Sequence, residues 1–180
     1  MAKYKKLGET LVYKSKLVEL YEDHLELPDG RQVVYDLLKH SGGAAVLPVD
    51  EEGRLVLIRQ YRNSVDQEVY EIPAGLREPE DHTGEICARR ELEEETGYHA
   101  EHLEFIAQAY GIIGFSNEKT DIYLAEHLVR CERHLDPDEN IEIYRFSLKE
   151  ALEMIQRKEI IDAKTIIAIL YYHMKQQEEE

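Results

Sequence analysis

The chain has 180 residues, of which 43% are hydrophobic, and its formal net charge is −16. The apolar fraction excludes a disordered chain, and the length suits one main domain with a short extension. No apolar run approaches the roughly 20 residues of a membrane span, and the basic start lacks the apolar stretch of a signal peptide. Because there are only two cysteines, Cys87 and Cys131, we expect a soluble protein of the reducing cytoplasm.

The negative net charge also restricts the molecules that the protein can bind. It repels polyanions, so the composition argues against a nucleic-acid-binding protein built on a basic patch. An anionic substrate would need a bridging cation, and acidic sites collect Mg²⁺ or Mn²⁺. Composition alone fits an acidic enzyme of another kind equally well.

The first part of the chain alternates apolar and polar residues from about 10 to 40. It is interrupted by Pro28-Asp29-Gly30, in which proline fixes φ and glycine accepts a positive φ. This pattern predicts a β-hairpin arm, which we assign to residues 1–42.

Short apolar runs and polar breaks continue through the rest of the chain, of which we assign residues 43–176 to the main domain. A helix is expected from about Thr83 to Thr96, where Gly97 would end it. Strands are predicted at Ala44–Val49, Arg54–Gln60, Val69–Ile72, Leu103–Ala109 and Thr120–Ala125, and a further strand is expected before Ser147. Two more helices are predicted: one starts at a capping box formed by Ser147 and Glu150, and the other covers Asp162–Lys175. Residues 177–180 are expected to be frayed. The order of elements indicates a mixed α/β sandwich with strands mostly in hairpins.

The predicted helix carries Glu91, Glu94 and Glu95 at positions i, i+3 and i+4, which places three carboxylates on one face, whereas Glu93 points elsewhere. These like charges repel, and near a helix C-terminus they also oppose the macrodipole. A divalent cation with oxygen ligands would reverse the sign of this interaction. The alternative is a solvated acidic face.

The segment GLREPEDHTGEICARRELEEETGY, Gly75–Tyr98, resembles the Nudix box G-x5-E-x7-R-E-U-x-E-E-x-G-U, where U is aliphatic or aromatic. Its second half matches fully, from Arg90 to Tyr98. The preceding EIPAG, Glu71–Gly75, is typical of the ADP-ribose pyrophosphatase branch of that family. The resemblance implies a Nudix-type mixed-sheet α/β/α sandwich with an N-terminal antiparallel β arm.

The first half of the box departs from the pattern. The loop after Gly75 has one extra residue, and His82 stands where the family has a glutamate that orients the box arginine, Arg90. Glu80, Asp81 or Glu85 could take over that task, and the sequence does not distinguish them.

By resemblance, the carbonyl of Ala74 and the carboxylates of Glu91 and Glu95 hold Mg²⁺, with Mn²⁺ as a possible substitute, and Glu94 and Arg90 belong to the catalytic group. The metal would neutralise the diphosphate and lower the pKa of the attacking water. The general base is expected in the acidic loop DPDENIE, with Glu139 as first choice and Glu142 as second. A solvated acidic turn is the alternative for that loop.

The substrate-side residues are also carried over by resemblance. Arg62 would contact the phosphate or ribose, since its planar fork donates to two oxygens. Glu118 ends the loop GIIGFSNE, as a glutamate does in the ADP-ribose group, although Ile112-Ile113-Gly114 replaces S-P-G. The arm resembles an extra sheet that crosses to a partner subunit, so we expect a homodimer in which Tyr13 or Tyr21 stacks on adenine.

The function that the resemblance implies is Mg²⁺-dependent hydrolysis of a nucleoside-diphosphate sugar, above all of ADP-ribose to AMP and ribose 5-phosphate. GDP-mannose and other nucleoside-diphosphate or triphosphate substrates remain open, because fold and box do not fix the substrate. A different class is a catalytically weak Nudix-like sensor that binds a nucleotide. An acidic interaction protein would explain the charge but not the motifs.

Overall fold

The computed structural model describes residues 3–137 and 139–179 and divides into two compact units. The first unit, which we call the arm, is the chain up to Gly42 together with Tyr110–Lys119. The second unit, the body, is Gly43–Ala109 together with the chain from Thr120 onward. The arm thus joins the start of the chain to a later loop.

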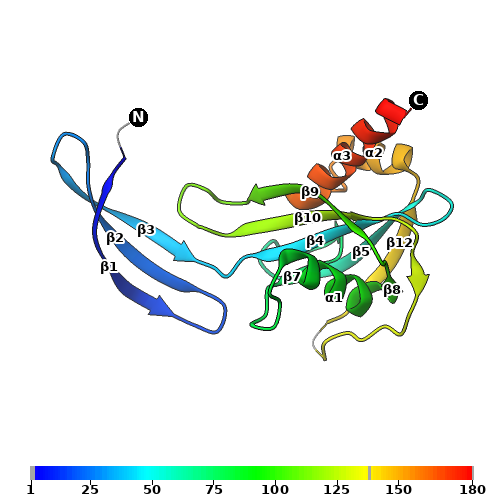
Figure 1. Ribbon diagram of the computed structural model, residues 1–180, viewed down its shortest axis with the longest axis horizontal. Helices are drawn as coiled ribbons and strands as arrows, with labels where there is room; N and C mark the ends of the chain where they lie inside the picture. Colours follow the sequence, from blue (N-terminus) through cyan, green and yellow to red (C-terminus); the bar gives the residue numbers. More distant parts are fainter. Residues whose placement is uncertain (1–2, 138, 180) are drawn as a thin grey trace. The chain divides into compact units, whose positions relative to one another are not determined.

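The arm is an antiparallel sheet of three strands, β1 (Lys5–Lys14), β2 (Glu19–Glu26) and β3 (Gln32–Lys39), in that order (Figure 1). The predicted turn joins β2 to β3, and Gly30 has a φ of 84°. The predicted single hairpin omitted the pairing of β1 with β2. The loop Tyr110–Lys119 follows the edge of β3, where the Leu38 N–H donates to the carbonyl of Phe115 at 2.7 Å.

Three sheets form the framework of the body. The central sheet has the strand order β7 (Ala74–Leu76), β4 (Gly43–Pro48), β10 (Lys119–Ala125), β9 (Leu103–Tyr110). The second sheet has the order β12 (Glu142–Phe146), β5 (Leu55–Arg62), β6 (Gln67–Glu71). The smallest sheet pairs β11 (Val129–Arg130) with β8 (Tyr98–His99). Strands β4 and β10 are parallel and distant in sequence. This pairing was not foreseen by the prediction of strands mostly in hairpins.

Helices cover both sides of the central sheet, as alternate residues of β4 show. Ala45 and Leu47 pack in the core formed with α2 (Leu148–Gln156) and α3 (Ala163–Glu179), whereas Ala44 and Val46 pack in the core formed with α1 (Gly84–Thr96). All four residues are fully buried. A strand buried on both faces needs a layer on each side. The predicted α/β/α sandwich is therefore confirmed, and Figure 1 shows α1 opposite α2 and α3.

The ends of the helices follow local signals. The Thr83 hydroxyl accepts from the Ile86 N–H, Gly97 ends α1 with a left-handed φ of 66°, and Ser147 and Glu150 form the predicted capping box of α2. Within the described residues, no helix is long and apolar enough to cross a membrane.

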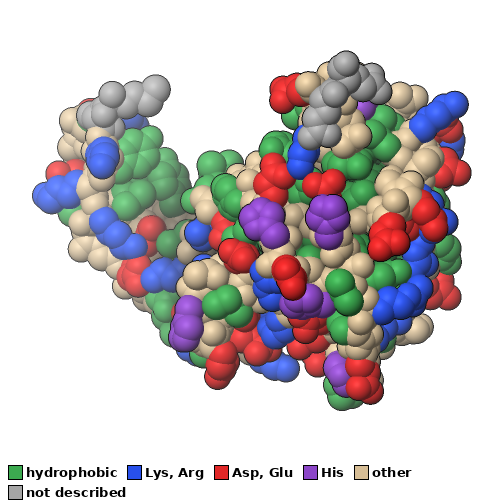
Figure 2. Space-filling view, turned by 45° about the vertical axis from the view of Figure 1, so that its right-hand side comes forward, with side chains coloured by type: hydrophobic (Ala, Val, Ile, Leu, Met, Phe, Trp, Pro, Cys, Tyr) green, Lys and Arg blue, Asp and Glu red, His purple; other side chains and the backbone are tan. Residues whose placement is uncertain are grey.

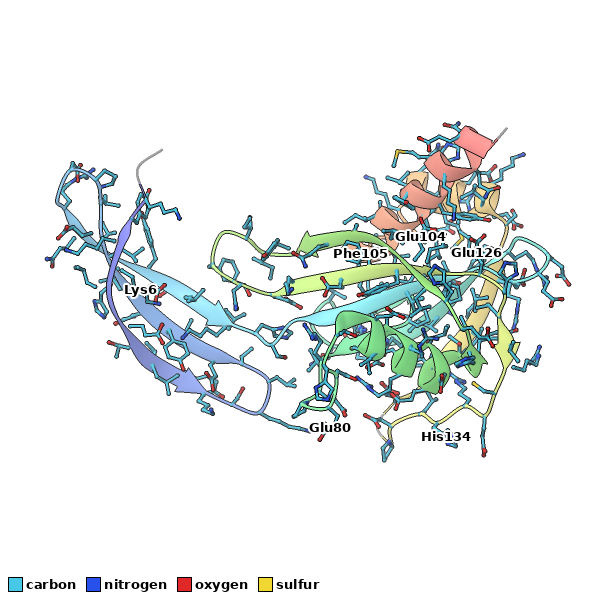
Figure 3. The ribbon with its side chains drawn as sticks, viewed as in Figure 1. Lys6, Glu80, Glu104, Phe105, Glu126 and His134 are labelled. Carbon is cyan, nitrogen blue, oxygen red and sulfur yellow. The ribbon has the colours of Figure 1, made fainter. Side chains whose placement is uncertain are left out.

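Helix α3 extends to Glu179, four residues beyond the predicted end at Lys175. Residues 177–179, which we expected to be frayed, are helical, and residue 180 lies outside the described residues. The Lys175 ammonium binds Glu104 at 2.7 Å and Glu126 at 3.3 Å, which ties this end of the helix to β9 and to the residue after β10. Glu104 and Glu126 are labelled in Figure 3. On the face shown in Figure 2, Asp and Glu side chains are interspersed with Lys and Arg.

Candidate active site

Helix α1 presents its glutamates at different depths. Glu91 and Glu95 are 7% and 1% exposed, whereas Glu94 is more exposed. Glu93 lies elsewhere, as predicted, and its carboxylate is 2.7 Å from Nδ1 of His99. The solvated acidic face considered from the sequence does not describe the two buried residues. Two carboxylates that are withdrawn from water on one side of a helix require a specific environment.

That environment is the segment that follows β6. The carboxylate of Glu91 lies so close to Gly75 that a Cβ at this position would be 2.0 Å from Oε1 of Glu91. A side chain at position 75 would therefore displace the Glu91 carboxylate from its observed place. The Ala74 N–H donates to Oε2 of Glu95 at 3.0 Å. The motif EIPAG and the glutamate helix, which are separate in sequence, therefore meet at Ala74 and Gly75.

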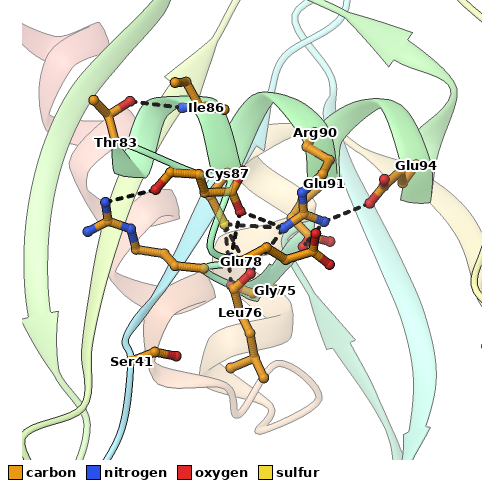
Figure 4. Close-up of polar contacts among 12 residues, drawn as sticks. Ser41, Gly75, Leu76, Glu78, Thr83, Ile86, Cys87, Arg90, Glu91 and Glu94 are labelled. Atoms are coloured by element: carbon orange, nitrogen blue, oxygen red, sulfur yellow. Dashed lines mark hydrogen bonds and ion pairs between the residues drawn. The ribbon is translucent and has the colours of Figure 1, made fainter.

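Arg90 connects Glu91 and Glu94 to the loop before the helix (Figure 4). Its Nη2 donates to the carbonyl of Leu76 at 3.0 Å and to Oδ2 of Asp81 at 2.9 Å. Its Nη1 lies 2.7 Å from Oε1 of Glu91 and 2.8 Å from Oε2 of Glu94. The planar guanidinium is thus fixed on both sides, which is the geometry that arginine provides and lysine does not.

The structure also answers which acid orients Arg90. Asp81 is buried, and its Oδ2 accepts from both Arg90 and the Glu78 N–H at 2.9 Å. Glu85 instead pairs with Arg89, and Glu80 and His82 are exposed. The extra residue in the loop places an aspartate where the box pattern has a glutamate, one position before His82.

Burial dominates the electrostatics of the two deep glutamates. It raises the pKa of Glu91 to about 7, although the charge of Arg90 opposes this effect. Burial and the charge of Glu91 raise the pKa of Glu95 to about 9, and the Ala74 N–H compensates only in part. The charge of Glu139 raises both pKa values further. Like charges are therefore concentrated here in a region of low dielectric.

A third buried glutamate, Glu71 on β6, behaves in the opposite way. Burial would raise its pKa, but the hydrogen bonds of Arg62 and the charge of Lys164 hold the pKa below its ordinary value. Nε and Nη2 of Arg62 donate to the two carboxylate oxygens at 2.6 and 3.0 Å, and Nζ of Lys164 lies 2.5 Å from Oε2. Glu71 is therefore saturated by protein cations.

Arg62 and Glu139 line the same depression, which has a volume of about 490 Å³ and is completed by Gln60, Tyr61, Asp136 and Asn140. Within the acidic loop, the Asp136 N–H donates to Oε2 of Glu139 at 3.1 Å. The second-choice base, Glu142, is exposed and accepts from the Tyr144 hydroxyl at 2.7 Å. Residue 138 of the loop lies outside the described residues.

The remaining predicted substrate residues belong to the arm. Tyr13 on β1 is 58% exposed. Tyr21 on β2 is half-buried, with Nζ of Lys39 3.8 Å from its ring centroid, which makes it a packed tyrosine. Glu118 lies 4.0 Å from Nδ1 of His40.

The donor set in the body fits a divalent cation of the Mg²⁺ type. Glu91 and Glu95 supply hard oxygen ligands beside the backbone of Ala74, and their raised pKa values show that protein cations leave their charge under-compensated. Among the described residues, no three His, Cys, Asp or Glu side chains already form a ligand cluster. Glu91 is held by Arg90 and Glu95 by the Ala74 N–H, so binding would exchange these contacts for the cation.

Several residues of the site were missed from the sequence. Glu71 was noted only as part of EIPAG, and Lys164 and Thr165 only as part of the closing helix, DAKTIIAIL. The sequence carries no local signal for this pairing, because neighbouring strand residues point to opposite faces and an acid before an apolar residue is commonly exposed. One of the two partners of Glu71, Lys164, is 93 positions away along the chain.

Comparison with known proteins identifies the family. The NUDIX domain family matches residues 39–168, so the chain belongs to the Nudix family and the prediction of a hydrolase of this family is confirmed. A crystal structure of an ADP compounds hydrolase superposes with a TM-score of 0.87 over 99% of this chain and 97% of that one, at 23% identity, which supports the fold. Nudix enzymes generally use a divalent metal such as Mg²⁺.

Particular relatives narrow the comparison. The ADP-ribose pyrophosphatase of Bacillus subtilis is 38% identical over 96% of this chain and 94% of its own length. The methanol dehydrogenase activator of Bacillus methanolicus is 36% identical, over 92% and 90%. A GDP-mannose pyrophosphatase from Cronobacter sakazakii is 30% identical, over 81% and 87%. The chain is thus a Nudix hydrolase similar to ADP-ribose pyrophosphatases.

Proposed function

We propose that this protein hydrolyses the diphosphate of ADP-ribose to AMP and ribose 5-phosphate in the presence of Mg²⁺. The observation that carries the proposal is the buried pair Glu91 and Glu95 beside Ala74, with pKa values of about 7 and about 9. A carboxylate pair of this kind is costly without a cation and favourable with one. In this role Glu91, Glu95 and the carbonyl of Ala74 hold the metal.

The other residues divide the work of the reaction. A bound divalent cation neutralises the diphosphate and lowers the pKa of the attacking water. Glu139, whose charge acts on both deep glutamates, takes the proton of that water, and Arg62 in the same depression donates to phosphate oxygens. Water adds across the P–O–P bridge: one P–O bond forms, another breaks, and the leaving phosphate keeps the bridging oxygen.

Arg90 and Glu94 act beside the metal in this proposal. Arg90 fixes the orientation of Glu91 and is itself fixed by Asp81, while Glu94 shares Nη1 of Arg90. The intact anchor at Asp81 favours an enzyme over the nucleotide-binding sensor, because the irregular first half of the box still orients the arginine. Glu118 is proposed as a further substrate contact.

The choice of ADP-ribose rests on the relatives. Full-length similarity to ADP-ribose pyrophosphatases at 38% and 29% identity favours it. GDP-mannose is the second candidate, because pyrophosphatases of that name are similar at 30% identity. Base and terminal-sugar contacts decide between the two, and these are determined by few residues.

We further infer a cytoplasmic homodimer. The arm exposes large apolar side chains, among them Leu7, Leu11, Val12, Tyr13, Leu17, Val34 and Tyr35. Such exposure is a common feature of surfaces that pair with another subunit. Figure 2 shows hydrophobic side chains gathered on the arm. Tyr13 would then be available to stack on the adenine of the partner's substrate. Sedimentation that shows only a fully active monomer would overturn the dimer.

The function is tested by incubating the protein with ADP-ribose, GDP-mannose, NADH, diadenosine polyphosphates or deoxynucleoside triphosphates, with Mg²⁺ or Mn²⁺. Chromatography should show AMP and ribose 5-phosphate from ADP-ribose as the fastest reaction. Faster release of GMP from GDP-mannose would move the assignment to the second substrate. If nothing turns over while ADP-ribose still binds, the protein is a sensor.

A further inference from the structure

The start of α3 is attached to the segment that carries the metal-binding backbone. The carboxylate of Asp162 accepts from both the N–H and the hydroxyl of Thr165, at 3.0 and 2.6 Å. The same Thr165 oxygen, fully buried, accepts from the Ile72 N–H at 2.9 Å. Ile72 stands between Glu71 and Pro73-Ala74, so the first turn of the helix holds this segment through its backbone.

Lys164 lies in the same turn and reaches Glu71. Its Nζ is 2.5 Å from Oε2 of Glu71 and 3.1 Å from Oδ1 of Asp162, and its side chain is 18% exposed. Glu71 also receives the Nε and Nη2 groups of Arg62. Two cations therefore share one buried carboxylate, and the second one comes from an element distant in sequence.

This sharing has a consequence for Arg62. With Glu71 as its sole partner, a guanidinium forms a neutral pair in which the carboxylate competes with any incoming phosphate. Lys164 satisfies part of that carboxylate and also neutralises Asp162, which would otherwise add charge to an acidic site. The Arg62 side chain is 40% exposed, it lines the depression with Glu139, and its Nη1 lies outside the pair with Glu71.

We infer that Lys164 is a positioning residue for substrate binding: it holds Glu71 so that Arg62 keeps its orientation and its positive charge for a phosphate group. The inference rests on the proposed function of the same site. The inferred role differs from a purely structural one. It predicts that removal of Lys164 weakens the affinity for the diphosphate substrate to a greater extent than it lowers the stability of the fold.

The chain offers a matched control on the same helix. Lys175 also binds two carboxylates, Glu104 and Glu126, and its side chain is 23% exposed. It lies in α3 eleven positions after Lys164. Lys175→Met removes an equivalent ion pair without touching the segment Glu71–Ala74.

The test compares wild type, Lys164→Met, Lys164→Arg and Lys175→Met. For ADP-ribose with Mg²⁺, Lys164→Met should raise KM about tenfold with kcat changed less than about threefold, the pattern of lost ground-state binding. Lys164→Arg should restore most of the affinity, and Lys175→Met should leave KM within about twofold. Calorimetric titration of ADP-ribose with EDTA present should show the same order of Kd, and thermal unfolding should show that all variants fold.

Equal effects of Lys164→Met and Lys175→Met on KM and Kd would overturn the role of Lys164 while leaving the hydrolase assignment intact. If wild type binds ADP-ribose but does not hydrolyse it, the proposed function fails, and the Kd series alone decides the role of Lys164. If wild type neither binds nor hydrolyses ADP-ribose, both proposals fail.

Discussion

Three buried glutamates of the body differ in what surrounds them. Glu71 is paired with Arg62 and Lys164, and its pKa lies below the ordinary value. Glu91 and Glu95 have pKa values of about 7 and about 9, because burial and the charges of neighbouring carboxylates exceed the compensation that Arg90 and the Ala74 N–H provide. The depth of burial is similar in all three. Partner charge, not burial, therefore separates a glutamate that holds the structure from a pair whose negative charge protein cations compensate only in part.

This comparison predicts opposite consequences of neutralising the two kinds of buried glutamate. Where cations saturate a buried carboxylate, its removal leaves unpaired positive charge. Where a carboxylate lacks a cation, its removal relieves a desolvation cost in the metal-free protein. Activity and stability should therefore change together in one case and in opposite directions in the other.

The largest effect is expected for Glu95→Gln. Loss of a ligand charge should lower kcat for ADP-ribose by about a thousandfold, since metal stabilisation of the transition state is worth several kcal/mol. Without metal at pH 8, the variant should be at least as resistant to urea as wild type, because a buried carboxyl with a pKa of about 9 must take up a proton when the chain folds at this pH, and glutamine does not. Rate assays and urea titrations check both halves. Retained activity would remove Glu95 from the metal site.

Asp81→Asn tests whether the displaced aspartate supports Arg90. The change keeps the shape but removes the charge that faces Nη2, so activity should fall between about 10- and 100-fold, as for other groups that orient metal ligands. Glu80→Gln, at the exposed neighbouring position, is the control and should leave the rate unchanged. If the two variants behave alike, Arg90 does not depend on Asp81.

Glu71→Gln is expected to destabilise the fold. It leaves Arg62 and Lys164 without their shared carboxylate, and the cost should be about 2 kcal/mol, because the partial exposure of Arg62 reduces the full penalty of a broken buried pair. Equilibrium urea unfolding measures this. A variant as stable as wild type would show that the cations find water or other partners at no cost.

The smallest effect concerns pH without metal. The raised pKa values of Glu91 and Glu95 mean that the folded state binds more protons than the unfolded chain, in which glutamate titrates near 4.3. Their contribution to stability is complete below that pH and is lost as pH rises through about 7 and about 9. The urea midpoint should therefore fall between pH 6 and 9 in wild type and less in Glu95→Gln. A midpoint that rises over this range would contradict the assignment.

The parts of the fold that could be predicted from the sequence are those set by interactions between residues close together in the chain. Thr83, Gly97 and the Ser147 capping box act within one turn, and the sequence located the helices they bound. The parallel pairing of β4 with β10 joins distant segments and has no local signal. The pairing of β1 with β2 is local, but the turn at Ser15–Val18 lacks the Pro-Asp-Gly signature on which the prediction relied.

The features of the candidate site also divide into those set by local geometry, which could be predicted, and those set by tertiary contacts, which could not. Glutamates at i and i+4 on one helix are brought together by helix geometry alone, so Glu91 and Glu95 could be predicted as a pair. Which acid orients Arg90 depended on how the loop absorbs an extra residue, and the sequence left Asp81 among three possibilities. The attachment of Lys164 and Thr165 to the EIPAG segment is a tertiary contact that no spacing rule encodes.

Direct metal binding tests the central claim that the under-compensated charge of Glu91 and Glu95 forms a site for Mg²⁺ or Mn²⁺. Mn²⁺ would be titrated into wild type, Glu95→Gln and the control Glu80→Gln at pH 8, and free Mn²⁺ measured by electron paramagnetic resonance. We predict binding to wild type and Glu80→Gln and an affinity at least about tenfold weaker in Glu95→Gln, as expected when a charged ligand is lost. Equal Mn²⁺ affinity of all three proteins would contradict the account.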